Sequence, residues 1–263
     1  MTSDVHPLAG LGVLVTRPQQ QSDQLCRLIE QAGGHPRRLP LLSIEGPVDP
    51  AAVTARLCHG GNDDAWIFTS PNAVDWAARL HPPGGTPPWP RVFAAAGHGT
   101  ARALTALGCS TVLMPSQDGA AGLLQLPLLC NATGQRLLIV CGERPLPLLA
   151  ESLRARGITF DRIAVYRRRA LTYPPQVIAQ MLGMVDAVIV SSGESLRQLH
   201  ALTPATERSR LFDLQLAVPS PRVLKIAERL GFRHIPLIPD RVGDEGFTQV
   251  LAHWRLTIGQ NRK

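Results

Sequence analysis

Small polar residues follow several apolar runs of this sequence. "TSPN" (69–72) and "SSGE" (191–194) each end such a run, and "AGHGT" (96–100) and "VPSPR" (218–222) follow later ones. At the carboxyl end of a parallel strand, the next helix exposes unpaired N–H groups and the positive end of its dipole. These turns therefore suit an anionic ligand. The alternative is that the serines only cap their helices.

The sequence has two tyrosines, Tyr166 and Tyr173. Tyr166 ends an apolar run and precedes the three arginines 167–169. A phenol near cations can donate a hydrogen bond or act as a weak general acid. A strand tyrosine that only packs its ring is the alternative reading.

The usual catalytic motifs are missing from the sequence. It contains no GxSxG, HExxH, P-loop, GxGxxG or DxD cluster, so hydrolase, kinase and dehydrogenase readings lose their strongest support. The eight histidines occur singly, with His98 alone in a candidate turn, and no metal site is expected. The dispersed acidic residues offer no pair for glycosidic chemistry.

Composition indicates a globular protein with an anionic partner. The 263 residues suffice for two domains, with 44% hydrophobic and 18% charged residues. The net charge of +7 favours negatively charged partners, but the arginines cluster only at 162–169, and the long basic stripe that a duplex requires is missing. Without an apolar run of about 18 residues or a signal-peptide pattern, a cytoplasmic location is expected.

Five cysteines are scattered without CxxC spacing: Cys26, Cys58, Cys109, Cys130 and Cys141. Their odd number and wide spacing predict reduced, mostly buried thiols, and neither disulfides nor a metal site.

Alternating elements predict an α/β fold. β-rich runs occur at 11–16, 65–69, 91–96, 136–141, 186–191 and 214–218. Helical spacing occurs at 23–32, 100–107, 146–156 and 222–230. Continuous apolar strands that alternate with helices predict parallel sheets covered on both faces. A left-handed C-cap is expected at the glycines that follow the helices: Gly33, Gly108, Gly157 and Gly231.

Two halves of the chain, 11–130 and 136–257, show the same order of features. Asp64 precedes Ser70 by six residues, as Asp186 precedes Ser192. The extended stretches 37–45 and 162–171 occupy the same place in the two halves. The shared order predicts an internal repeat.

Motifs along nearly the whole chain resemble the uroporphyrinogen-III synthase family. They are "VLVTRP" (13–18), "IFTSPNAV" (67–74), "AAGHGTARAL" (95–104), "CGERPLPLLAESLRARG" (141–157), "VYRRR" (165–169) and "LAVPSPRVLKIAERLGF" (216–232). The resemblance implies two parallel-sheet α/β domains joined by a two-stranded connector, with the active site in the interdomain cleft. Residues 1–40 and 168–263 would form one domain and 43–165 the other.

The resemblance also implies the activity, a cyclising carbon–oxygen lyase of haem and sirohaem biosynthesis. Such an enzyme closes hydroxymethylbilane, a linear tetrapyrrole with eight carboxylates, to uroporphyrinogen III. It removes water and inverts the last pyrrole ring (ring D), without a cofactor. Orientation of the substrate is expected to dominate over acid–base chemistry.

By the same resemblance, Tyr166 is the catalytic candidate that assists loss of the hydroxyl. The residues implied to bind substrate carboxylates, largely through backbone groups, are Ser70, Gly97, Thr100, Gly142, Ser191, Ser192 and Ser220. Arg222 is interpreted as the second-half counterpart of Thr100, and it departs from the hydroxyl that the family often has there.

Two other classes stay open at this point. A two-lobed, non-catalytic receptor for small anions would share α/β lobes and basic composition. A nucleic-acid-binding protein would draw only on the net charge. The expected partner is the small polyanionic substrate, with no nucleic acid and no membrane, and the expected oligomeric state is a monomer.

Overall fold

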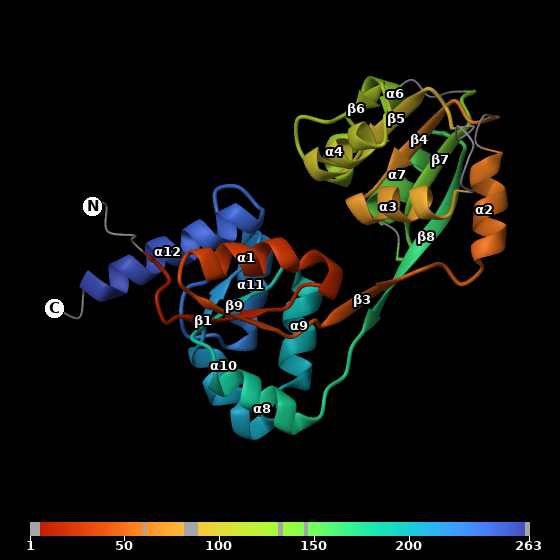
Figure 1. Cartoon of the computed structure of the whole chain (residues 1–263). Helices are drawn as coiled ribbons and strands as arrows, with labels where there is room; N and C mark the ends of the chain where they lie inside the picture. Colours follow the sequence, from red (N-terminus) through yellow and green to blue (C-terminus); the bar gives the residue numbers. More distant parts are fainter. Residues whose placement is uncertain (1–5, 60–61, 82–88, 131–133, 145–146, 261–263) are drawn as a thin grey trace. The chain divides into compact units, whose positions relative to one another are not determined.

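The computed structural model describes residues 6–59, 62–81, 89–130, 134–144 and 147–260 (Figure 1). The chain forms two compact units. Unit 1 comprises Met1–Ser43 and Arg169–Lys263, and unit 2 comprises Ile44–Arg168. The unit boundaries fall inside two strands, β3 (Leu42–Glu45) and β8 (Phe160–Ala170). The domain limits expected from the sequence, 1–40 with 168–263 and 43–165, stay a prediction.

Unit 1 is built on a four-stranded sheet with the order β10-β9-β1-β2, in which every described pairing is parallel. Its first elements are β1 (Gly12–Val15), a 3-10 turn η1 (Gln19–Gln21), α1 (Asp23–Gln31) and β2 (His35–Arg38). The later elements are α8 (Pro175–Gly183), β9 (Ala187–Ile189), α9 (Gly193–Leu202), η3 (Ala205–Glu207), α10 (Arg208–Asp213), β10 (Gln215–Ala217), α11 (Pro221–Leu230) and α12 (Asp244–Gln260).

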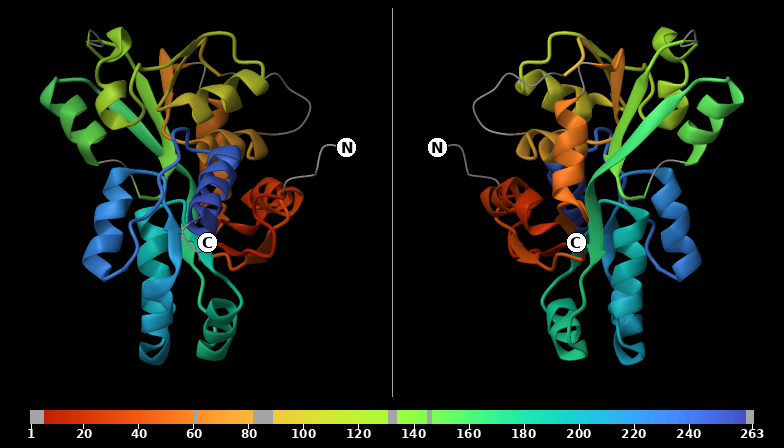
Figure 2. Two further views of the ribbon diagram at one scale, coloured as in Figure 1. Left: turned by 90° about the vertical axis from the view of Figure 1, so that its left-hand side faces the viewer. Right: turned by 90° about the vertical axis from the view of Figure 1, so that its right-hand side faces the viewer.

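Unit 2 is built on a six-stranded sheet with the order β3-β8-β7-β4-β5-β6. Its first elements after β3 are α2 (Pro50–Cys58), β4 (Ala65–Phe68), α3 (Pro71–Arg79), β5 (Val92–Ala95), α4 (His98–Ala106) and β6 (Val112–Leu113). They are followed by α5 (Ala120–Leu123), α6 (Pro127–Cys130), β7 (Leu137–Gly142), α7 (Pro147–Ala155) and β8. With 11 residues, β8 is the longest described strand, the long green arrow of Figures 1 and 2.

The central strands of each sheet are buried on both faces, as expected for strands without polar alternation. In unit 2, Trp66 and Phe68 of β4 pack with α2, α3 and α4, whereas Ala65 and Ile67 of the same strand pack with α5 and α7. In unit 1, Leu14 of β1 faces α8, α9 and α11, and its neighbours on the strand face α1 and α12. The α/β class with mostly parallel sheets is therefore confirmed.

The four glycines expected to end helices all have positive φ. Gly33, Gly108, Gly157 and Gly231 have φ of 85°, 85°, 70° and 96°. This conformation is cheap for glycine because it has no Cβ. The prediction of left-handed C-caps is confirmed.

The repeat seen in the sequence corresponds to two sheets of one topology. The order β2-β1-β9-β10 in unit 1 matches β8-β7-β4-β5 in unit 2. Of these four matching strands, each sheet thus takes two from each half of the chain. The repeated aspartates have the same role in both: Asp186 Oδ2 accepts the Gly12 N–H at 2.9 Å, and Asp64 Oδ2 accepts the Arg136 N–H at 2.6 Å.

The structure corrects the pairing of Thr100 with Arg222. Gly97 is the N-cap of α4 and Ser220 is the N-cap of α11, so Thr100 corresponds to Val223, three residues after the cap in each case. Both side chains are buried, whereas Arg222 is exposed. Counted from the repeated aspartates Asp64 and Asp186, β10 begins one position later than β5. The alignment of the two halves by sequence is therefore shifted by one residue at this point.

Candidate active site

Tyr166 is held in the last half of β8, and its side chain is only 4% exposed. The ladder with β7 pairs Cys141 with Ala164 but Gly142 with Tyr166, so Val165 is an extra residue in a β-bulge. In a regular strand, consecutive side chains point to opposite faces. Because of the bulge, Val165 and Tyr166 both reach the core under α2 and α3.

Ser70 lies against the phenol oxygen of Tyr166. It is the N-cap of α3, and its Oγ accepts the Ala73 N–H at 3.2 Å. The same Oγ is 3.1 Å from Tyr166 Oη. Helix capping, the simpler role considered from the sequence, is therefore real, and it coexists with a contact to the candidate catalytic residue.

Arg168 approaches Tyr166 from the same strand. Its Nη2 is 3.4 Å from the phenol oxygen, and its Cζ lies 5.8 Å from the centre of the ring. A guanidinium over an aromatic face is attracted by the ring's negative quadrupole. The cation therefore contacts both the ring and the hydroxyl of Tyr166.

Gly142, at the end of β7, leaves room for the tyrosine ring. A Cβ at this position would lie 2.7 Å from Tyr166 Cζ, closer than two carbon atoms can approach. The backbone N–H of Glu143 donates to the Tyr166 carbonyl at 2.8 Å, which fixes the two segments side by side.

These residues line a cavity of about 120 Å³. Its walls are Thr69, Ser70, Gly142, Glu143, Arg144, Tyr166 and Arg168. The lining combines two guanidinium groups, one carboxylate and three hydroxyls. Such a site can bind an acidic group and present a phenol proton to it.

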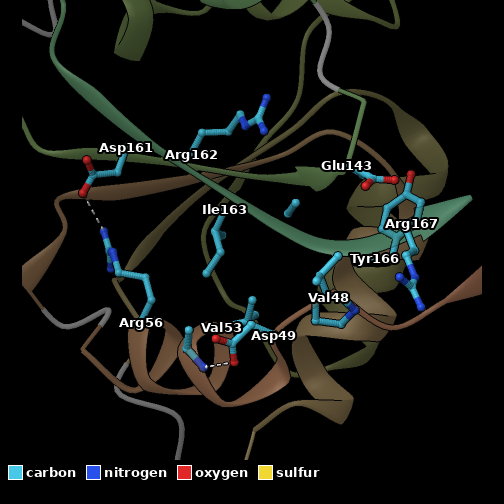
Figure 3. Close-up of a pocket in the computed structure, with 13 residues that line it drawn as sticks. Val48, Asp49, Val53, Arg56, Glu143, Asp161, Arg162, Ile163, Tyr166 and Arg167 are labelled. Atoms are coloured by element: carbon cyan, nitrogen blue, oxygen red, sulfur yellow. Dashed lines mark hydrogen bonds and ion pairs between the residues drawn. The ribbon is translucent and has the colours of Figure 1, made fainter.

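A larger hollow of about 500 Å³ lies between α2 and β8 and shares Glu143 and Tyr166 with the first cavity (Figure 3). Figure 3 shows Ile163 and Arg162 on opposite sides of the β8 ribbon. Charges in this hollow are partly paired: Arg56 contacts Asp161 at 3.3 Å, and Asp49 caps α2 by accepting the Ala52 N–H.

Gly97 and Thr100 belong to α4 of the same unit. Gly97 is its N-cap, and a Cβ there would meet the Asp118 carboxylate at 2.7 Å. Asp118 Oδ1 also lies 3.0 Å from His98 Nδ1, within hydrogen-bond distance. Thr100 is 3% exposed, so its side chain is buried.

The other expected residues belong to unit 1. Ser192 caps α9 by accepting the Ser195 N–H at 3.1 Å, and its Oγ lies 3.0 Å from Ser195 Oγ. Ser191 is half-buried beside it. Ser220 precedes α11, and within the described residues its hydroxyl makes no capping bond.

The structure thus brings Ser70, Gly142 and Tyr166 into one cavity and distributes the remaining expected residues over three other helix N-termini. Thr69, Glu143, Arg144 and Arg168 also line the cavity but were not singled out by the sequence. For Arg168 a signal existed: it is two residues from Tyr166 along a strand, which puts it on the same side.

The thiols offer no competing nucleophile at this site. Burial raises the pKa of the Cys141 thiol, next to Gly142, to about 11, so it stays protonated near neutral pH. All five cysteines are free, but only Cys26 and Cys141 are buried, and Cys130 is exposed. The expectation of mostly buried thiols was wrong, since three of them lie on partly accessible helix and loop positions.

Among the described residues, no group of three or more His, Cys, Asp or Glu side chains is arranged to hold a metal ion. Over the same part of the chain, every helix is too short or too polar to cross a membrane.

Fold and site together define a class: α/β proteins with two parallel sheets of one topology and a phenol among arginines at the end of a strand. Residues 23–249 match the family model described as uroporphyrinogen-III synthase HemD. The chain therefore belongs to the uroporphyrinogen-III synthase family, whose members act in tetrapyrrole biosynthesis by cyclising hydroxymethylbilane. The family and the enzyme class expected from the sequence are confirmed.

Relatives support the assignment over most of the chain. The uroporphyrinogen-III synthase of Escherichia coli is 30% identical over 241 residues, covering 89% of this chain and 97% of that protein. The Salmonella typhimurium enzyme is also 30% identical, with the same coverage. Among solved structures, a mutant uroporphyrinogen III synthase from the extremely thermophilic bacterium Thermus thermophilus is similar with a TM-score of 0.63, at 20% identity, over 95% of this chain and 99% of that one. The Helicobacter pylori protein follows at 0.59, with 13% identity, over 93% and 99%.

Proposed function

We propose that this chain closes hydroxymethylbilane to uroporphyrinogen III and that Tyr166 assists loss of the substrate hydroxyl. Membership of the family supports the reaction. The observation that carries the role of Tyr166 is its phenol oxygen at a cavity wall, 3.1 Å from Ser70 Oγ and 3.4 Å from Arg168 Nη2.

The phenol proton converts the departing hydroxyl into water while the carbon–oxygen bond breaks. The pyrrole nitrogen supplies the electron pair that the carbon loses, which gives an azafulvene. Attack by the substituted carbon of the last ring then forms a spiro intermediate, and its fragmentation and reclosure invert that ring. A proton is released when the macrocycle regains its aromatic pyrroles, so the tyrosine is restored.

Carboxylates of the substrate would be bound by the helix N-termini and by arginines. In unit 2 these are the N-termini of α3 and α4, near Ser70, Gly97 and Thr100, together with the backbone at Gly142. In unit 1 they are those of α9 and α11, near Ser191, Ser192 and Ser220. Oriented N–H groups and helix dipoles suit such anions. A cleft between two domains as the place of the reaction stays a prediction.

The decisive experiment supplies hydroxymethylbilane to the purified protein and separates the product isomers after oxidation to porphyrins. Isomer III is expected. Isomer I alone, the product of unassisted closure, would refute the synthase function and favour a receptor for small anions. In the same assay, Tyr166→Phe is expected to lower turnover by about a hundredfold, the range of a lost general acid, with little change in thermal unfolding.

The location and assembly are proposals of the same kind. We expect a cytoplasmic monomer without a nucleic-acid partner. Light scattering of the purified chain should give the mass of one copy, and a mass of two copies would contradict this.

A further inference from the structure

We propose that Ser70 and Arg168 position Tyr166 by donating hydrogen bonds to its oxygen, so that the phenol proton points away from both of them and into the cavity. The inference rests on the role of Tyr166 proposed above. It gives Ser70 a different task from the carboxylate binding expected from the sequence, and it gives Arg168 a task where the sequence assigned none.

The donors and acceptors around Tyr166 Oη support hydrogen bonds that run from Ser70 and Arg168 to the tyrosine oxygen. A phenol has one proton and accepts on its oxygen, and a guanidinium only donates. Arg168 therefore donates to Tyr166 Oη. Ser70 Oγ already accepts the Ala73 N–H, so its own proton is available for Tyr166 at 3.1 Å. With two donors on the oxygen, the tyrosine proton is directed to a third partner.

The equivalent serine of unit 1 shows that this contact does not follow from capping. Ser192 caps α9 with the same geometry, but its Oγ contacts Ser195 Oγ at 3.0 Å. In unit 2 the corresponding position faces Tyr166 because the bulge at Val165 aims the ring toward α3. In unit 2, therefore, Ser70 both caps α3 and contacts Tyr166.

Arg168 also balances the charge of the proton transfer. When the phenol proton leaves with the substrate hydroxyl as water, the tyrosine oxygen becomes negative. The guanidinium of Arg168 is within hydrogen-bond reach of that oxygen and over the ring, so it stabilises the phenolate until a proton released at ring closure returns.

Kinetics of Ser70 variants test the positioning role against substrate binding. Ser70→Ala is expected to lower kcat about tenfold with KM nearly unchanged, as for one lost hydrogen bond in the transition state. Ser70→Thr keeps the hydroxyl and should restore most of kcat. Thr105→Ala is the matched control, because it removes a hydroxyl from an exposed position of α4 in the same unit, where Thr105 Oγ1 donates to the Ala101 carbonyl at 3.0 Å. A raised KM with unchanged kcat would overturn the proposal.

Variants of Arg168 test the charge. Arg168→Gln is expected to lower kcat more than Arg168→Lys, which keeps the positive charge. Arg91→Gln removes an equal charge from an exposed position just before β5, outside both cavities, and should leave kcat within about twofold of the parent. Equal losses for Arg91→Gln and Arg168→Gln would show a general charge effect and would refute a specific role.

A spectroscopic measurement separates this inference from the proposed function. With only two tyrosines in the chain, labelling tyrosine Cζ with carbon-13 gives two signals, and Tyr173→Phe assigns them. Ser70→Ala and Arg168→Gln should each shift the Tyr166 signal and leave that of Tyr173, whose hydroxyl donates to the Pro40 carbonyl at 2.6 Å, in place. An unmoved Tyr166 signal would refute the positioning pair. Shifted signals together with full activity of Tyr166→Phe would keep the pair and refute the catalytic role.

Discussion

Gly142 lies directly against the ring of Tyr166: a Cβ on Gly142 would come within 2.7 Å of Tyr166 Cζ and 3.0 Å of its Oη. We expect Gly142→Ala to push the phenol away from Ser70 and Arg168, and so to lower turnover by at least about tenfold. Steady-state rates with hydroxymethylbilane, together with the carbon-13 signal of Tyr166, measure both effects.

The control for that substitution is Gly183→Ala. Gly183 is the last residue of α8, and a new Cβ there would meet only the flexible end of Arg210, with Nη1 at 3.0 Å. Its thermal unfolding should be unchanged or slightly higher, because alanine favours helices over glycine. A Tyr166 signal that stays in place in Gly142→Ala would show that the strand gives way instead of the ring.

The repeated aspartates Asp64 and Asp186 are expected to hold the starts of β7 and β1. Replacing either with alanine leaves a backbone N–H at a strand end without its acceptor and should cost about 1–2 kcal/mol of local stability. Hydrogen exchange would show faster exchange of the Gly12 amide in Asp186→Ala and of the Arg136 amide in Asp64→Ala. Asp75→Ala, at an exposed position in α3, is the control. Crossed effects, with either amide responding to the other aspartate, would contradict the assignment.

Arg17 links the end of β1 to the start of α12. Its guanidinium pairs with Asp244 and lies 5.7 Å from the centre of the Phe247 ring, and both charged side chains are 17% exposed. We expect Arg17→Ala to lower the free energy of unfolding by about 2–3 kcal/mol, because Asp244 stays largely buried without its partner. Urea unfolding followed by circular dichroism measures this.

A second ion pair provides the comparison for Arg17. Arg233 pairs with Asp213, but both side chains are 53% exposed. Arg233→Ala should therefore cost less than about 1 kcal/mol. Similar losses for the two variants would mean that burial does not govern the strength of these pairs.

His200, near the end of α9, is expected to make stability depend on pH. Burial, with a smaller contribution from Arg208, lowers the pKa of this imidazole, which stacks on Phe212 with ring centres 5.9 Å apart. The unfolded chain thus binds the proton more tightly than the folded one. Stability is complete above the ordinary histidine pKa of about 6.5 and falls as pH decreases through the lowered folded value.

His200→Gln removes this titration. The difference in urea midpoint between parent and variant should shrink or reverse as pH is lowered from about 7.5 to 5.5, because only the parent loses the contribution of the neutral imidazole. His253→Gln, at an exposed position in α12, is the control. Parallel pH curves for parent and His200→Gln would contradict the prediction.

Local patterns were enough to predict the central strands and several helices of this fold. The runs at 65–69 and 186–191 became β4 and β9, and the segments 23–32 and 222–230 became α1 and α11. These predictions succeed because apolar continuity and glycine stop signals are written within a few residues of each element. Parallel pairing could be predicted as well, because a helix lies between successive strands in the sequence.

Features that depend on distant segments could not be read in the same way. The bulge at Val165 reverses the side to which Tyr166 points, and no residue type around it signals an extra position in the ladder. The cavity lining of Glu143 and Arg144 depends on how the segment after β7 passes β8. Likewise, the sequence does not show that β10 begins one residue later in its half than β5 does in the other, so by sequence alone Arg222 looks equivalent to Thr100.

The exchange of strands between the two halves of the chain sets an order of events during synthesis. Unit 2 is one continuous stretch and can complete its sheet soon after β8 leaves the ribosome. In unit 1, however, β1 must wait for β9, and Gly12 for an acceptor 174 residues further on. The apolar strand β1 therefore keeps one edge unpaired until β9 has been made, and an unpaired apolar edge favours aggregation of the nascent chain.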